Sequence, residues 1–194
     1  MISAAEFQQV QRKTTLYIDI DDTLIAQVLP GSGYDLRPCV NTQLTVLGRM
    51  YDCCWLTSWP YTAPDSGVSV ATLIRSLYGA AINETFRYAE RDRDHPDGKA
   101  GFVLRADPPR EDAPHEDSSK DWYWLEDPIP PGELAALAAA GKLDRYIPVE
   151  PTGAWGFLDA VNELFLRTGK TAADLRHAKA RPEWFDRSYL ASDR

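Results

Sequence analysis

Apolar residues recur along the 194-residue chain in short runs, separated by stretches in which they are spaced three or four positions apart. The short runs contain many aromatic and β-branched residues and end at polar or turn-forming residues, which is typical of buried strands. This pattern predicts strands at 14–20, 51–56, 81–89, 121–125 and 145–149. The strand at 14–20 is the clearest, because it ends directly at carboxylates.

The stretches between these runs predict helices. They are a helix capped by Asn41 with Leu44, Leu47 and Met50 on one face, a helix at 68–78, a short helix opened by Lys99, a helix from Pro131 to Gly141, a helix on which Trp155, Leu158, Val161 and Phe165 share a face, and a helix at 171–181. Strand and helix alternate several times, which favours an α/β domain with a mainly parallel sheet. Ligands of such sheets bind beyond the carboxyl ends of the strands.

Two polar segments interrupt this alternation. The segment with Pro30, Gly31, Gly33 and Pro38 is expected to form a loop, and the acidic stretch 107–120 an exposed loop.

The composition narrows the function classes. Acidic residues outnumber basic ones by 29 to 21, giving a net charge of -8, which argues against a general nucleic-acid-binding protein. No apolar run approaches the roughly 20 residues that span a bilayer, and the polar segment 1–13 lacks a signal-peptide core, so we expect a cytoplasmic protein with no membrane contact. Cys39, Cys53 and Cys54 are interpreted as buried, reduced side chains.

Side chains that could act in catalysis or bind a ligand follow the predicted strands at four places. These are Asp19, Asp21 and Thr23 after the first strand, Thr57 after the second, Lys99 after the third, and Glu126 with Asp127 after the fourth. A single acidic pair after a strand is commonly a turn or a helix cap. Because the carboxyl ends of parallel strands share one edge, the joint pattern favours a common site instead.

These residues carry a family resemblance. The sequence from Leu16 to Leu24, with Asp-Ile-Asp-Asp-Thr after an apolar strand, resembles the first motif of the haloacid dehalogenase-like (HAD) superfamily. Thr57, Lys99 and the pair Glu126-Asp127 resemble its second, third and fourth motifs. The resemblance implies a Rossmann-like three-layer α/β/α sandwich with a mainly parallel central sheet.

The resemblance also implies roles for these residues. Asp19 would attack phosphorus and form an aspartyl-phosphate, and Asp21 would protonate the leaving oxygen and later activate water. Thr23, Thr57 and Lys99 would bind the phosphate group. The family's dehalogenases and ion-pumping ATPases lack the second aspartate, so Asp21 favours a phosphatase, a phosphoric monoester hydrolase.

The carboxylates themselves predict a metal ion. Two unit charges 4 Å apart repel by roughly 4 kcal/mol at an effective dielectric near 20, and a phosphate dianion adds to this repulsion. Mg²⁺ is the usual partner of carboxylates and phosphate. Asp19 and Asp127 are the first candidates for side-chain ligands and Glu126 the next, and the family also uses the backbone carbonyl at the position of Asp21.

The identity of the active-site lysine stays open between Lys99 and Lys120. Lys120 is closer in sequence to Glu126 and Asp127, but it begins the predicted strand and so belongs to the opposite edge of the sheet. Lys99 follows a strand, so topology favours it.

The spacing between motifs leaves no room for a separate cap domain. We therefore expect one catalytic domain over residues 1–194, with 167–194 as a C-terminal helical extension. An open site would suit a phosphorylated small molecule or macromolecule, and neither the substrate nor the oligomeric state follows from the sequence. Two alternatives remain: a HAD-fold binding or regulatory protein with little turnover, and a nucleic-acid-end phosphatase suggested by a modest basic excess after Arg167.

Overall fold

The computed structural model describes six segments of the chain, which contain seven strands and four α-helices. The described residues are 14–27, 34–58, 86–89, 98–105, 122–152 and 154–171. The elements are β1 (Thr15–Ile18), β2 (Ile25–Gln27), β3 (Tyr34–Leu36), α2 (Val40–Met50), β4 (Asp52–Trp55), β5 (Arg87–Tyr88), α5 (Gly98–Arg105), β6 (Trp122–Glu126), α6 (Pro131–Ala139), a 3-10 turn η1 (Leu143–Arg145), β7 (Tyr146–Pro148) and α7 (Gly156–Arg167).

Five parallel strands form the main sheet of the described residues, in the order β5-β4-β1-β6-β7. β1 lies at the centre, where Ile18 is in register with Trp55 of β4 on one side and Leu125 of β6 on the other. The parallel direction brings the carboxyl ends of all five strands to one edge. The predicted α/β class with a parallel sheet is therefore confirmed.

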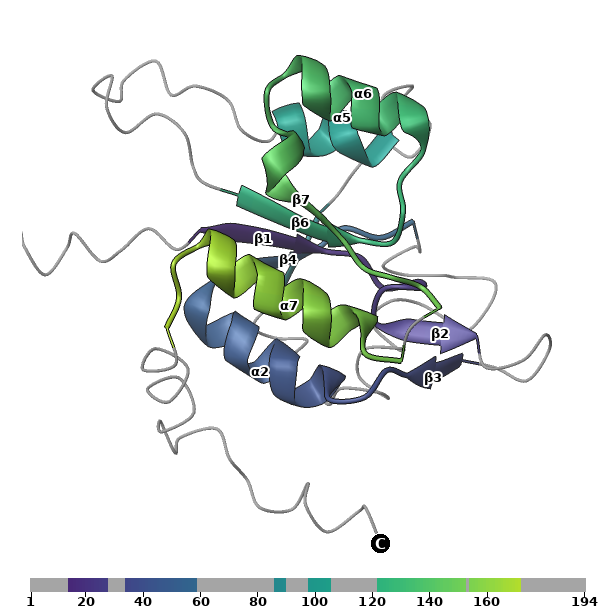
Figure 1. The fold of residues 1–194 in the computed structure, drawn as a ribbon, viewed down its shortest axis with the longest axis vertical. Coiled ribbons are helices and arrows are strands. Elements are labelled where there is room, and N and C mark those ends of the chain that lie inside the picture. Colours follow the sequence, from purple (N-terminus) through teal and green to yellow (C-terminus); the bar gives the residue numbers. More distant parts are fainter. Residues whose placement is uncertain are drawn as a thin grey trace, which may run out of the picture.

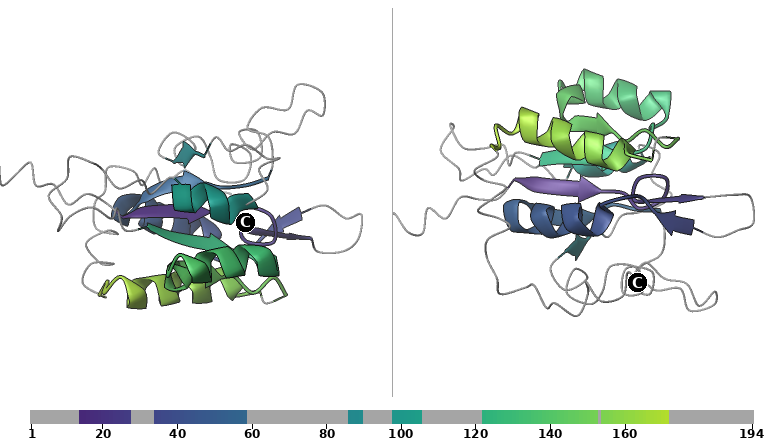
Figure 2. Two further views of the ribbon diagram at one scale, coloured as in Figure 1. Left: turned by 90° about the horizontal axis from the view of Figure 1, so that it is seen from above. Right: turned by 60° about the horizontal axis from the view of Figure 1, so that its bottom comes forward.

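Helices lie on both faces of this sheet (Figure 1). α5 and α6 pack against each other on one face, and α2 and α7 pack against each other on the other. Figure 2 shows the same elements from two further directions, with the β2–β3 hairpin projecting beyond the carboxyl end of β1. None of the described helices combines the length and the apolar character needed to cross a membrane.

The apolar core follows the alternation of side chains along β1. Leu16 and Ile18 are fully buried on the face covered by α2 and α7, and Tyr17 between them is buried on the face covered by α5 and α6. Full burial of an aliphatic side chain of this size contributes about 1.5–3 kcal/mol. Trp55 of β4 packs on Phe86 with ring centroids 4.8 Å apart, which extends the first core cluster toward β5.

The structure corrects the predicted loop around Pro30 to Pro38. β3 lies inside this segment and pairs antiparallel with β2, which precedes it, while residues 28–33 lie outside the described residues. Each strand has only three residues, which is too short for a period-two pattern to stand out in the sequence.

The beginning of α2 also differs from the prediction. Asn41 lies inside the helix, and the residue before the first helical turn is Cys39, whose φ of 64° is in the left-handed region. No side chain caps this helix end. Cys39 is exposed, which corrects the interpretation of it as a buried thiol, whereas Cys53 and Cys54 are buried as expected.

The face of α7 is shifted by one position from the predicted one. Trp155 precedes the helix and is 53% exposed, while Phe157 and Leu164 join Val161 and Phe165 in the core. The predicted strand at 81–89 is represented by β5 alone among the described residues. The predicted helices at 68–78 and beyond residue 171 and the acidic loop at 107–120 lie outside the described residues.

Candidate active site

Asp19 is the first residue after β1, at the carboxyl end of the central strand. The apolar residues before it are held between β4 and β6, and its backbone N–H donates to the carbonyl of Leu125 at 3.0 Å. This pairing carries the sheet one residue past β1 and fixes the backbone of Asp19. The residue is 1% exposed, so its carboxylate is almost completely buried.

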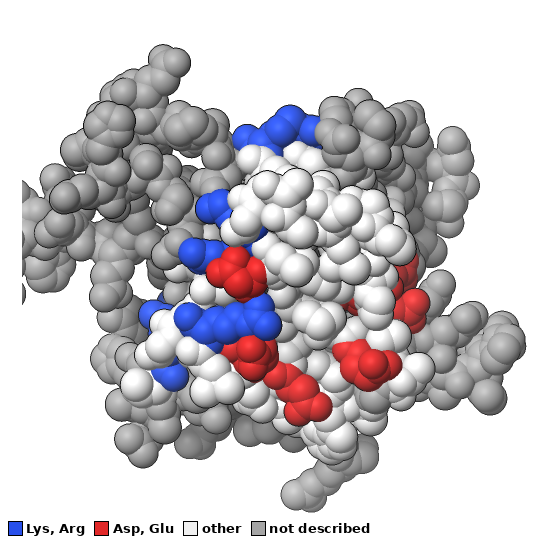
Figure 3. Space-filling model, turned by 45° about the horizontal axis from the view of Figure 1, so that its top comes forward, with Lys and Arg blue, Asp and Glu red and all other residues white. Residues whose placement is uncertain are grey.

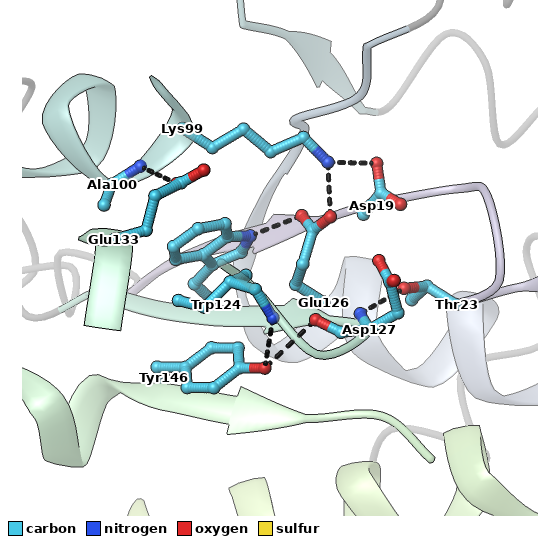
Figure 4. Close-up of polar contacts among 10 residues, drawn as sticks. Asp19, Thr23, Lys99, Ala100, Trp124, Glu126, Asp127, Glu133 and Tyr146 are labelled. Atoms are coloured by element: carbon cyan, nitrogen blue, oxygen red, sulfur yellow. Dashed lines mark hydrogen bonds and ion pairs between the residues drawn. The ribbon is translucent and has the colours of Figure 1, made fainter. Parts of the chain in front are cut away.

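Lys99 binds the Asp19 carboxylate from the neighbouring helix. Its Nζ donates to Asp19 Oδ1 at 2.7 Å and also to Glu126 Oε1 (Figure 4). Lys99 is the second residue of α5, so the start of that helix faces the carboxyl edge of the sheet. Lys120, the alternative lysine, lies outside the described residues.

The start of α5 is held in place by Glu133 of α6. Glu133 Oε2 accepts a hydrogen bond from the backbone N–H of Ala100 at 2.7 Å, which satisfies one of the free donors in the first turn. Gly98 before it has a φ of 56°, and a Cβ added there would lie 2.6 Å from Glu133 Oε1. Glycine therefore allows the close approach that orients Lys99.

Both carboxylate oxygens of Glu126 have protein partners. Oε1 accepts from Lys99, and Oε2 accepts from the indole Nε1 of Trp124 at 3.0 Å. Trp124 and Glu126 lie two residues apart on β6, so their side chains share one face of the strand. This arrangement holds Glu126 rigidly beside Asp19.

Asp127 is fixed through its backbone. Its N–H donates to Thr23 Oγ1 at 3.0 Å, and its carbonyl accepts from the hydroxyl of Tyr146 at 3.0 Å. The same hydroxyl accepts from the N–H of Ile129 at 3.3 Å. Burial raises the pKa of Tyr146 to about 12, so this hydroxyl stays protonated and keeps its donor role near neutral pH.

The remaining predicted residues lie at the same edge of the sheet. Thr57 follows β4 by two residues and is 1% exposed, and Thr23 is fully buried beside Asp127. Asp21 is half-buried at the start of the turn after β1, where its backbone forms an isolated bridge with Ile25. The structure thus places all seven predicted residues at the predicted edge of the sheet.

The charges at this site shift the pKa values of its members. Burial raises the pKa of Asp19 to about 6, although Lys99 opposes this shift. Burial and the neighbouring Asp19 raise the pKa of Glu126 well above its usual range, again against the effect of Lys99. Burial lowers the pKa of Lys99, but the two carboxylates outweigh it and the net shift is upward.

Three carboxylates form the one group among the described residues that has the geometry to hold a metal ion. Oxygens of Asp19, Glu126 and Asp127 all lie within 4.8 Å of one another. With Lys99, the ionised group would carry three negative charges and one positive charge. Its oxygen donors suit a hard divalent cation, which would neutralise the remaining charge. The donor set therefore fits a cation such as Mg²⁺.

Sequence reasoning missed three residues that orient this group, namely Trp124, Glu133 and Tyr146. Trp124 could have been found from its spacing of two residues before Glu126 on the same strand. Glu133 left no such signal, because its partner Ala100 lies 33 positions away in the sequence.

Comparison with known proteins adds no family assignment. The chain matches no protein-family model, and no curated protein matches it.

Proposed function

We propose that this chain is a Mg²⁺-dependent phosphatase of the HAD type, built on a Rossmann-like three-layer α/β/α sandwich. The observation that carries the proposal is the pairing of buried Asp19 with Lys99 at the carboxyl end of the central strand, beside Glu126 and Asp127. Carboxylates are rarely buried this deeply. A buried carboxylate with a shifted pKa at the end of a strand is a candidate for catalysis.

In the proposed reaction, a carboxylate oxygen of Asp19 attacks phosphorus as the bond from phosphorus to the ester oxygen breaks. Asp21 donates a proton to that leaving oxygen, which departs as an alcohol. Asp21 then accepts a proton from water, whose oxygen attacks phosphorus and displaces Asp19 as a carboxylate. Inorganic phosphate leaves, and both aspartates return to their starting states.

The other residues prepare this chemistry. Lys99 favours the ionised, nucleophilic form of Asp19 against the effect of burial. Glu126 holds Lys99 in position, and Thr23 and Thr57 would bind phosphate oxygens through their hydroxyls. Asp19 and Asp127, together with the backbone carbonyl of Asp21, would hold the cation, and Glu126 would support it. A bound Mg²⁺ would supply neutralisation of the phosphate charge.

The test is hydrolysis of p-nitrophenyl phosphate and of a panel of phosphometabolites and phosphopeptides, with Mg²⁺ and with a chelator. We expect Mg²⁺-dependent release of phosphate that is lost in Asp19→Asn and kept in Asp52→Asn, which alters an exposed carboxylate at the other end of β4. Trapping with borohydride after exposure to substrate should mark Asp19 by mass spectrometry, because an acyl phosphate is reduced and a free carboxylate is not.

Absence of turnover across the panel, with Mg²⁺ present, would contradict the proposal. Capture of a partner protein that survives Asp19→Asn would then favour a binding or regulatory role for the same fold.

A further inference from the structure

Arg37 is a buried arginine whose guanidinium joins two loops at the carboxyl edge of the sheet. The residue is 4% exposed. Its Nη2 donates to the carbonyl of Asp22 at 2.6 Å and to that of Pro151 at 2.7 Å, and its Nη1 donates to the carbonyl of Glu150 at 3.0 Å. Three backbone carbonyls therefore converge on one cation, which connects the turn after β1 to the loop after β7.

The first of these loops contains the proposed acid and base. Asp22 lies between Asp21 and Thr23, and its φ of 51° is in the left-handed region that a non-glycine residue rarely adopts. The backbone N–H of Arg37 also donates to the carbonyl of Leu24 at 3.0 Å. Arg37 thus holds the turn at two points, just after Asp21 and just after Thr23.

The second loop provides a fixed support. The carbonyl of Glu150 lies against the start of α7, where a Cβ added to Gly156 would come within 2.3 Å of it. One residue earlier, the N–H of Val149 donates to the carbonyl of Glu126 at 2.8 Å. The loop that receives Arg37 is therefore packed on α7 and bonded to β6, and it cannot shift freely.

We propose that Arg37 is the positioning residue that sets Asp21 against the leaving oxygen of the substrate, by fixing the left-handed backbone at Asp22. This inference rests on the proposed phosphatase function. It assigns Arg37 no contact with substrate, because Nη1 and Nη2 donate to backbone carbonyls.

A purely structural role and a positioning role predict different kinetics. Loss of general stability would lower activity on every substrate by a similar factor. Misplacement of the general acid would instead slow substrates with poor leaving groups, which need a proton, more than substrates with good leaving groups, which do not. The ratio kcat/KM for a series of aryl and alkyl phosphates reports this difference, because it covers the step in which the leaving group departs.

The experiment compares wild type, Arg37→Met and Arg37→Lys on dinitrophenyl phosphate, p-nitrophenyl phosphate, phenyl phosphate and an alkyl phosphate. For Arg37→Met we expect kcat/KM for the alkyl ester to fall about tenfold or more beyond the fall for dinitrophenyl phosphate. Added guanidinium should restore part of the loss for the alkyl ester. Arg37→Lys should be intermediate, since lysine lacks the planar fork that reaches three carbonyls.

Arg167 supplies the matched control. Its Nη1 donates to the carbonyls of Asp144 at 2.6 Å and Tyr146 at 3.0 Å, so it also binds backbone, but at the start of β7 rather than beyond its end. Arg167→Met should lower kcat/KM equally for all esters or leave it unchanged. Hydrogen exchange of the amides at 22–24 should accelerate in Arg37→Met and not in Arg167→Met, and this measurement also detects a variant that fails to fold.

An equal loss across the series in a folded Arg37→Met variant would overturn the inference while leaving the phosphatase proposal intact. Unchanged exchange at 22–24 would overturn it as well. If wild type hydrolysed none of the esters, the proposed function would fail, and the role of Arg37 would fail with it.

Discussion

The charged groups at the two ends of the parallel sheet differ in how far they are buried. At the carboxyl end, the side chains of Lys99, Asp19 and Glu126 are 12%, 2% and 6% exposed. At the amino end, Arg87 and Asp52 form a pair with 59% and 40% exposed side chains. Similar bond lengths therefore describe two different energetic situations, because water screens the second pair and not the first.

This difference is informative about function. Figure 3 shows one surface of the molecule on which most basic side chains gather along one side and mix with acidic ones, as expected of a solvated face. Exposed ion pairs change the free energy of unfolding by only about 0–1 kcal/mol. Burial of the charged group at the carboxyl end costs free energy that its ion pairs offset only in part, so its presence supports the proposal of an active site there.

Removal of the buried cation should have the largest effect. Lys99→Met leaves Asp19 and Glu126 buried together without their shared ammonium group, and breaking a buried pair in this way costs about 3–5 kcal/mol. We expect the free energy of unfolding in urea, without metal, to fall by this amount. Arg87→Met, which removes a surface cation, should change it by less than about 1 kcal/mol.

A loss below about 1 kcal/mol in Lys99→Met would mean that water reaches the carboxylates, and the contrast between the two ends would disappear. Added Mg²⁺ should recover part of the lost stability if the carboxylates hold a cation. Mg²⁺ should stabilise Arg87→Met and wild type by the same amount, since that mutation leaves the carboxylate group intact.

Removal of the buried anion should stabilise the protein near neutral pH. The pKa of Asp19 is raised by burial from 3.8 to about 6, so its ionisation is less favourable in the folded than in the unfolded chain. This difference weakens folding by on the order of 3 kcal/mol at about pH 7. We expect metal-free Asp19→Asn to unfold at a higher temperature than wild type there, although it abolishes the proposed activity.

The sign of this effect fixes its pH dependence. Below the pKa of the unfolded chain, Asp19 is protonated in both states and does not affect stability. As the pH rises from there through the pKa of the folded chain, its ionisation increasingly destabilises the fold. The advantage of Asp19→Asn should therefore shrink to about half near pH 5 and to about a fifth near pH 4, and it should nearly vanish near pH 3. Asp52→Asn serves as the control and should show no such gain. A gain that did not depend on pH would exclude this explanation.

The sequence was sufficient for the parts of the site that depend on local pattern. The apolar run before Asp19 and the turn residues around the other strands predicted β1, β4 and β6, and the parallel arrangement then predicted one shared edge. Lys99 was preferred over Lys120 by the same topological argument, and the structure places it on Asp19.

The parts that the sequence did not predict depend on contacts between distant residues. Arg37 and its acceptors at Glu150 and Pro151 are more than a hundred positions apart, and nothing near any of them marks the contact. Cys39, with a left-handed backbone, stands before α2 in place of the predicted cap at Asn41, three residues after the end of the β2–β3 hairpin. Tertiary packing overrode local propensity at this position.

The smallest expected effect concerns the exposed pair at the amino end. Arg87 binds Asp52 through two hydrogen bonds, Nε to Oδ1 at 3.1 Å and Nη2 to Oδ2 at 2.6 Å, which is the best geometry that an arginine and a carboxylate can adopt. A double-mutant cycle with Arg87→Met and Asp52→Asn should still give a coupling of only about 0.5 kcal/mol, because both side chains remain hydrated. The same cycle at about 1 M salt should give almost none, since the screening length falls to roughly 3 Å.

A parallel cycle with Lys99→Met and Asp19→Asn should retain most of its coupling in salt, because a buried pair is screened much less by monovalent salt than an exposed one. Equal salt sensitivity of the two couplings would mean that solvent reaches both ends alike, and burial would then no longer support Asp19 as the proposed nucleophile.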